Sequence, residues 1–200
     1  MSGSEVPFWI VLTHWGSRSI LFILGLLSIW SVATMIKCHR LLKRARGGEG
    51  SFDRLFESVR SGHPEMSAAE NSLYWEVLKE SVGYKEPARI DRSVRSLISL
   101  RKTEVEKNLT VLATLGANAP FIGLFGTVLG IIQAFGALGA DQNTGASVMS
   151  AISEALIATA VGLFVAIPAV MAFNFFSRGL RVLLNNCEAL RDRYIANLKG

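Results

Sequence analysis

The sequence is poor in charge and in cysteine. Only 18% of its 200 residues are charged, whereas 50% are hydrophobic, and soluble domains carry roughly 25% charged residues. High hydrophobicity with little charge excludes a disordered chain and argues against an ordinary soluble enzyme. The two cysteines, Cys38 and Cys187, are too few and too far apart for a disulfide framework or a cysteine metal site.

Motifs for cofactors and nucleotides are also missing. His14, His39 and His63 have no cysteine or carboxylate at ligand spacing, which argues against a bound metal. There is no GxxxxGK[ST] phosphate loop. The net charge is +5, but we expect the basic run at 37–46 to anchor a helix at anionic lipid headgroups rather than to bind nucleic acid. We therefore expect no cofactor, no metal, no nucleic acid and no enzymatic activity.

Charge is absent from three long stretches, at 19–36, 108–140 and, apart from Glu154, 142–177. A membrane-spanning helix needs about 20 apolar residues, and the second and third stretches exceed that length. The sequence therefore predicts an all-α, polytopic membrane protein whose long helices extend into the cytoplasm. The predicted segments are an outer N-terminus at 1–18, membrane helices at 19–36, 108–138 and 147–177, a cytoplasmic helical segment at 37–107, an outer loop at 139–146 and a cytoplasmic C-terminal helix at 178–200.

The distribution of basic residues predicts the orientation. Of the 21 Lys and Arg residues, all but Arg18 lie in 37–107 or 178–200. Basic residues mark the cytoplasmic side of a membrane protein, so we expect the N-terminus outside and the C-terminus in the cytoplasm. Because the basic run follows the first stretch instead of preceding it, we expect that helix to be retained and not cleaved as a signal peptide.

The cytoplasmic segment is predicted to hold short helices. Gly47, Gly48 and Gly50 are expected to end the first helix, and the apolar spacing predicts helices at 51–60 and 68–82. From Ala88 to Leu115 there is neither Gly nor Pro, which predicts one helix running into the second membrane stretch. We expect the apolar stripes to pack on neighbouring copies or on the extended membrane helices, because so short a segment has little core of its own.

Small residues recur at alternating spacings of three and four in both long stretches. They are Gly116, Ala119, Gly123, Gly126, Gly130 and Ala137 (with Gln133 between the last two), then Ala151, Ala155, Ala158, Gly162, Ala169 and Ala172 (with Val165 among them). Association of helices in a bilayer depends on close packing, which small residues permit. The pattern predicts tight packing along both helices, either in a ring of several subunits or within the three helices of one copy.

Two prolines lie inside the predicted membrane helices. Pro120 and Pro168 each remove one helical hydrogen bond, which a membrane helix tolerates when neighbours satisfy the freed carbonyl. They are candidate bends, or harmless interruptions.

Glu154 is the only ionisable residue within the second and third predicted membrane helices. An acid at the centre of a bilayer costs roughly 2.5 to 3.5 kcal/mol on insertion scales, so we expect it to face a cavity, a pore or a partner. Thr127 and Thr159 offer hydroxyls at comparable depth for a path of protons or hydrated ions. The alternative is that Glu154 lies near the outer interface and is solvated. A proton path would need a second acid, which another chain would have to supply.

Two blocks, LATLGANAPFIGLFGTVLGIIQAF at 112–135 and ISEALIATAVGLFVAIPAVMAFN at 152–174, resemble the ExbB/TolQ/MotA family of proton-channel motor subunits, most of all its TolQ and ExbB branches. The resemblance implies a pentameric ring in the bacterial inner membrane around single-helix partners of the ExbD/TolR type, each with an intramembrane aspartate. Glu154, Thr127 and Thr159 match the family's pore-lining acid and threonines. Proton flow would drive a TonB- or TolA-like transducer.

Other functions remain open from the sequence. MotA-type relatives usually have four membrane helices and a larger cytoplasmic domain, so a flagellar stator is less expected. A gliding-motor subunit, a non-conducting scaffold and a small transporter with broken helices are the alternatives. The powered process, whether envelope maintenance, nutrient uptake or motility, is not fixed.

Overall fold

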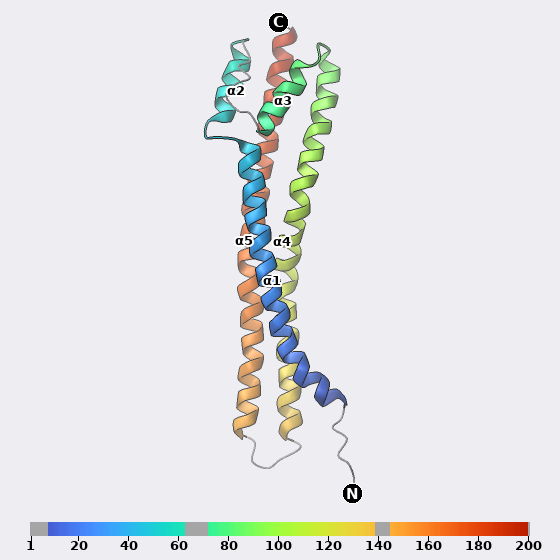
Figure 1. Cartoon of the computed structure of the whole chain (residues 1–200), viewed down its shortest axis with the longest axis vertical. Coiled ribbons are helices and arrows are strands. Elements are labelled where there is room, and N and C mark those ends of the chain that lie inside the picture. Colours follow the sequence, from blue (N-terminus) through green and yellow to red (C-terminus); the bar gives the residue numbers. More distant parts are fainter. Residues whose placement is uncertain (1–7, 63–71, 139–144, 200) are drawn as a thin grey trace. The chain divides into compact units, whose positions relative to one another are not determined.

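The computed structural model describes residues 8–62, 72–138 and 145–199, and these form helices without a strand. The helices are α1 (Phe8–Arg46), α2 (Ser51–Arg60), α3 (Leu73–Val82), α4 (Pro87–Leu138) and α5 (Gly145–Lys199), labelled in Figure 1. Within the described residues, 3 helices are long and apolar enough to cross a membrane. The predicted all-α class with three membrane helices is confirmed.

The chain divides into two compact units, and each is described by itself. The apolar unit comprises 1–35 and 111–172, and the charged unit comprises 36–110 and 173–200. The helices α1, α4 and α5 each contribute one part to the apolar unit and the other part to the charged unit.

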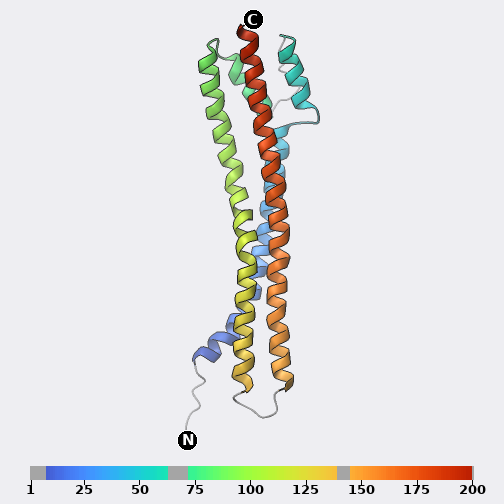
Figure 2. The same ribbon diagram turned by 180° about the vertical axis from the view of Figure 1, so that it is seen from behind.

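In the apolar unit, α4 and α5 run antiparallel and side by side, with α1 against them (Figures 1 and 2). A small core forms where α1 meets this pair. It contains Ile20, Leu24, Ala119, Val165 and Ala166, all at most 5% exposed. Large apolar side chains such as Phe22, Phe121 and Phe164 point outward and are about 70% exposed. An apolar exterior of this kind suits contact with lipid tails or with neighbouring membrane helices.

The helix ends follow local chemistry. α1 stops at Arg46, and Gly47 follows with a φ of 71°, a left-handed conformation that glycine adopts without strain. α2 has the predicted bounds. α3 begins at Leu73, later than the predicted position 68, because the side chain of Ser72 caps it by accepting a hydrogen bond from the Trp75 amide at 3.2 Å. The rest of the difference, residues 68–71, lies outside the described residues.

The long helices reach beyond the predicted membrane segments. α1 begins at Phe8, well before the predicted membrane segment at 19–36. α4 is unbroken from Pro87 to Leu138, which confirms the predicted continuous helix. Its first residue is a proline, whose missing amide hydrogen is not needed in the first turn. Most of the predicted outer loop lies outside the described residues, and α5 begins at Gly145.

The charged unit has its own core and polar links. Its fully buried side chains include Leu78, Ile90, Val94, Leu183, Cys187 and Leu190. α3 is held to α5 by a hydrogen bond from the Asn186 amide to the Tyr74 hydroxyl at 3.3 Å. α2 is held to α5 by a bond from Asn197 to the Val59 carbonyl. The apolar faces of α2 and α3 are thus buried within one copy. Of the two packing alternatives from the sequence, they pack on the extended helices and not on neighbouring copies.

Candidate functional site

In the apolar unit, α4 and α5 lie backbone against backbone at Gly123. A Cβ added to Gly123 would lie 2.7 Å from the Ala158 carbonyl oxygen and 3.2 Å from the Gly162 Cα. The same test on Gly162 gives 2.7 Å to the carbonyl oxygen of Ala119. Backbone therefore lies directly on backbone, and neither position has room for a side chain.

The small residues continue this contact along both helices. A Cβ at Gly126 would lie 2.7 Å from the Cβ of Ala158, and one at Gly130 would lie 2.5 Å from the Cβ of Ala155. Toward the other end of the unit, a Cβ at Gly116 would lie 2.5 Å from the Cγ2 of Val170. We call this line of contacts the glycine seam. It occupies facing sides of α4 and α5, as small-residue packing in membranes requires.

The first helix also meets the seam, as one of the two alternatives from the sequence allowed, although the sequence did not single out the contact. A Cβ at Gly126 would lie 3.2 Å from Cγ2 of Ile20 on α1. Ile20 and Leu24 are spaced by one helical turn, so they present one apolar edge to the other two helices. This spacing is the only sequence signal for the contact, and it is common in membrane helices.

The two prolines lie inside α4 and α5. Pro120 follows Ala119 directly, beside the contact with Gly162, and Pro168 comes two residues before Val170, which meets Gly116. Both prolines therefore lie next to seam contacts. Their role as bends stays a prediction.

The two threonines lie at the same level of the seam. Thr127 is next to Gly126 and Thr159 is next to Ala158, and these two small residues contact each other. Thr127 is 9% exposed, and its hydroxyl donates a hydrogen bond to the Leu124 carbonyl at 2.7 Å. The Thr159 hydroxyl oxygen is buried and has no hydrogen-bond partner among the described residues. A buried hydroxyl without a partner is costly in an apolar medium, so Thr159 has capacity to bind a water or a group from another chain.

Glu154 lies on α5, beside Ala155 of the seam. Its side chain is half-buried, and it makes no hydrogen bond or ion pair with the part of the chain that the structure describes. It is about 14 Å along the axis from the start of α5 and about 7.5 Å from Thr159. Five residues also turn the helix by about 140°, so Glu154 and Thr159 project from different sides of α5. One copy therefore does not bring these two groups together.

The groups gathered here are one carboxylate and two hydroxyls, which can exchange protons and form hydrogen bonds. No cluster of three or more metal-ligating side chains occurs among the described residues. A lone acid next to a tight helix seam, partly uncovered in a single copy, suits a position that a second chain covers.

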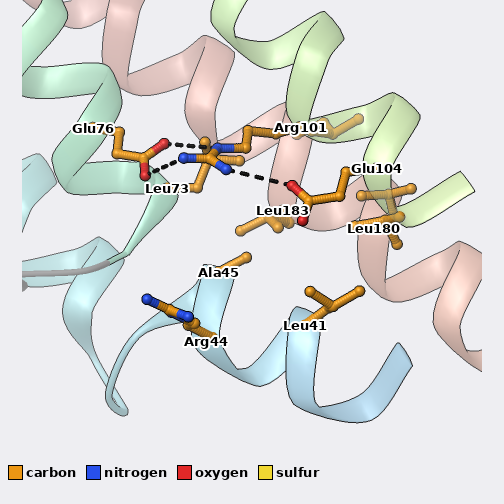
Figure 3. A pocket seen from close by; sticks show the side chains of 11 residues that line it. Leu41, Arg44, Ala45, Leu73, Glu76, Arg101, Glu104, Leu180 and Leu183 are labelled. Atoms are coloured by element: carbon orange, nitrogen blue, oxygen red, sulfur yellow. Dashed lines mark hydrogen bonds and ion pairs between the residues drawn. The ribbon is translucent and has the colours of Figure 1, made fainter. Parts of the chain in front are cut away.

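A second candidate site lies in the charged unit, and the sequence reasoning missed it. Glu76 on α3 accepts two hydrogen bonds from Arg101 on α4, at 2.7 and 3.0 Å, and Glu104 lies 3.4 Å from the same guanidinium. The hydrogen bond to Glu76 raises the pKa of Arg101 above its ordinary value. These charges line a pocket (Figure 3). Glu76 and Arg101 are too far apart in sequence for any helical spacing to reveal the pair.

Together, the fold and the seam define a multi-pass helical membrane protein with one acid beside its packed membrane helices. Comparison with known protein families identifies the family within this class of membrane proteins. The profile of the MotA/TolQ/ExbB proton channel family matches residues 65–189. The chain belongs to this family, and the resemblance seen in its sequence is confirmed.

Individual relatives agree with the family. The chain is 35% identical to the Tol-Pal system protein TolQ of Pseudomonas aeruginosa over 84% of its length and 70% of the relative's. It is 36% identical to TolQ of Haemophilus influenzae over 79% of the chain and 78% of the relative. It is 50% identical to the biopolymer transport protein ExbB of Xanthomonas campestris, but over only 44% of the chain and 36% of that protein. The match thus spans about a third of this ExbB.

Proposed function

We propose that the chain is the proton-channel subunit of an inner-membrane motor that turns proton-motive force into mechanical work on the cell envelope. Membership of the proton channel family supports the class of activity. The observation that carries the proposal is Glu154, a half-buried acid without a partner in the described chain, beside a glycine seam. An acid in such a place is retained for ion or proton movement, because an apolar residue would pack at lower cost.

The exposed surface of the apolar unit supports an assembly of several copies, a ring of five by the family resemblance. In one copy Glu154 is left partly uncovered, and lipid tails offer no hydrogen bonds to a carboxylate. In a ring, the side of α5 that carries Glu154 faces a central passage. The Thr159 hydroxyl, about 7.5 Å along the helix and on another of its sides, holds a water at a separate point of the path. Neighbouring copies cover part of the exposed apolar surface.

A partner chain completes the proton path in this proposal. The two membrane helices of the seam contain no second acid, so the group that receives the proton from Glu154, or passes it on, comes from a single-helix partner of the ExbD/TolR type. Each elementary charge that crosses 100 mV releases about 2.3 kcal/mol. A few protons therefore drive a conformational cycle, whose work passes to a TonB- or TolA-like transducer.

The orientation belongs to the same proposal. The basic residues of 37–107 and 178–200 face the cytoplasm, the N-terminus lies outside, and Pro120 and Pro168 bend the helices that line the passage. The rival function is a non-conducting scaffold in which Glu154 only holds copies together by hydrogen bonds.

Substitution at Glu154 separates the two functions. The chain, co-purified with its partner, is placed in liposomes, and proton flux under an imposed potential is followed with a pH-sensitive dye. Glu154→Gln keeps the size and hydrogen bonding of the side chain but cannot exchange a proton. We expect at least a tenfold loss of flux with an unchanged oligomer, whereas Ser153→Ala, at the exposed neighbouring position, keeps full flux. Normal flux in Glu154→Gln would favour the scaffold.

A further inference from the structure

A pocket in the charged unit has no role in the proposed proton path. Its volume is about 210 Å³, which is smaller than the roughly 300 to 1,000 Å³ of sites for drug-sized ligands. Its apolar wall comes from α1, α3, α4 and α5. These lining residues are Leu41, Ala45, Leu73, Val105, Leu180, Leu183 and Leu184, with Arg44, Glu76, Arg101 and Glu104 as the charged ones.

The charges around the pocket are separated by sign. On one side Glu76 and Glu104 flank Arg101, so that this group carries one net negative charge. Arg44 stands apart on α1 (Figure 3). Its side chain is exposed and forms no ion pair with any described residue. The pocket therefore has a negative side on α3 and α4, and a free guanidinium on α1.

The pocket also lies close to the ends of the membrane stretches. The charged residues that bound those stretches within this unit are Lys37, Lys107 and Arg178. The nearest lining residues on the same helices are Leu41, Val105 and Leu180. Each lies about 3 to 6 Å along the helix axis from the charged residue that bounds the stretch. The headgroup layer on each side of a bilayer is roughly 5 to 8 Å thick. Counted in this way, the pocket begins at headgroup level.

We propose that this pocket binds the headgroup of a zwitterionic phosphoethanolamine lipid. The phosphate ester bonds to the free guanidinium of Arg44, and the ammonium group donates to the carboxylates of Glu76 and Glu104. An anionic headgroup would meet two carboxylates without a cation of its own, and a purely cationic ligand would meet two guanidiniums. Only a ligand that carries both signs matches the pocket, and the leucines accommodate the first carbons of its chains.

The proposal is independent of proton conduction, and lipid retention tests it. The full chain is purified in nanodiscs of mixed phosphatidylethanolamine and phosphatidylglycerol, delipidated mildly, and examined by native mass spectrometry. We expect retained phosphatidylethanolamine. Arg44→Ala should reduce its occupancy about fivefold, as expected for one basic contact near a headgroup. Lys43→Ala, which removes an equal charge from the neighbouring exposed position outside the pocket, should retain it.

Two further measurements decide the chemistry. Glu104→Gln removes a negative charge and should shift retention toward phosphatidylglycerol. Soluble phosphoethanolamine, added to the detergent-purified chain, distinguishes a lipid from a free ligand: competition only at much higher concentration than the lipid indicates that the acyl chains contribute, and equal potency indicates a soluble zwitterion in the same site. Equal retention in Arg44→Ala and Lys43→Ala, or a wild-type preference for phosphatidylglycerol, would overturn the proposal.

Discussion

Gly123 on α4 and Gly162 on α5 face each other so closely that a Cβ on either would lie 3.1 to 3.2 Å from the Cα of the other. No side chain separates the two backbones at this point. The contact lies beside Thr159, one of the three residues proposed for the proton path, so the seam positions the groups on which the proposed function depends.

The first prediction concerns the seam itself. Gly123→Ala should destabilise the chain by about 1 to 3 kcal/mol, because the new methyl group meets backbone atoms that have no freedom to move aside. The measurement is unfolding by SDS or heat in detergent. The matched control is Gly25→Ala on α1, where an added Cβ has nothing within 4 Å. It should be neutral or slightly stabilising, since alanine favours a helix. Equal effects at the two positions would contradict a close seam.

The second prediction separates stability from conduction at the threonines. Thr159→Val removes a buried hydroxyl that has no partner among the described residues, so the unfolding free energy should stay within about 0.5 kcal/mol or rise. Proton flux should nevertheless fall severalfold, because the valine cannot hold a water on the path. Thr127→Val removes the bond to the Leu124 carbonyl, and should cost roughly 0.5 to 1.5 kcal/mol. Unchanged flux in Thr159→Val would remove that residue from the path.

The third prediction concerns the ion pair between α3 and α4. A double-mutant cycle with Arg101→Ala and Glu76→Ala should give a coupling of about 0.5 to 1 kcal/mol, since the pair is bidentate but partly exposed. The pair Lys102–Glu106, at 3.7 Å with both side chains 50% exposed, serves as the reference and should give about 0.3 to 0.5 kcal/mol. Equal coupling energies would show that the Glu76–Arg101 pair does not help to hold α3 against α4.

The fourth prediction concerns alkaline pH. Burial raises the pKa of the Cys187 thiol from 9.0 to about 12. Above pH 9 the unfolded chain loses this proton whereas the folded chain keeps it. Stability is therefore fully present below pH 9 and declines up to pH 12, by at most about 1.4 kcal/mol per pH unit.

The difference between wild type and Cys187→Ala isolates this thiol from other groups that titrate at high pH. We expect the wild type to lose more stability than the variant between pH 9 and 11, measured by chemical unfolding at each pH. A thiol reagent should label Cys187 at pH 8 only after the charged unit unfolds. Rapid labelling of the native chain would contradict its burial.

Much of the fold is readable from the sequence because lipid and water impose strong patterns. The charge-free stretches predicted three membrane helices, and the absence of Gly and Pro after Ala88 predicted the unbroken α4. The start of α1 was not predicted, because a helix continues past a charge such as Arg18 once water or headgroups solvate it. The start of α3 depended on the Ser72 cap, whose effect is confined to one turn.

The candidate site was less readable. The seam spacing predicted which faces are small, but not that Gly126 would also meet Ile20, because the contact depends on where α1 lies in three dimensions. The Glu76–Arg101 fork joins distant segments, and neither residue stands out among many surface charges. Glu154 was found because it is the only charged residue in a long apolar stretch, which can be seen in the sequence alone.

The backbone contact at Gly123 and Gly162 also restricts how the sequence can diversify. At either position every other amino acid adds atoms that meet the facing backbone, so substitutions there should be disfavoured. Phe121 and Phe164 point outward and are about 70% exposed in one copy, so apolar replacements there should be better tolerated. In a saturation-mutagenesis library selected by growth, positions 123 and 162 should therefore tolerate almost no substitution. The nearby outward-facing positions 121 and 164 should tolerate many.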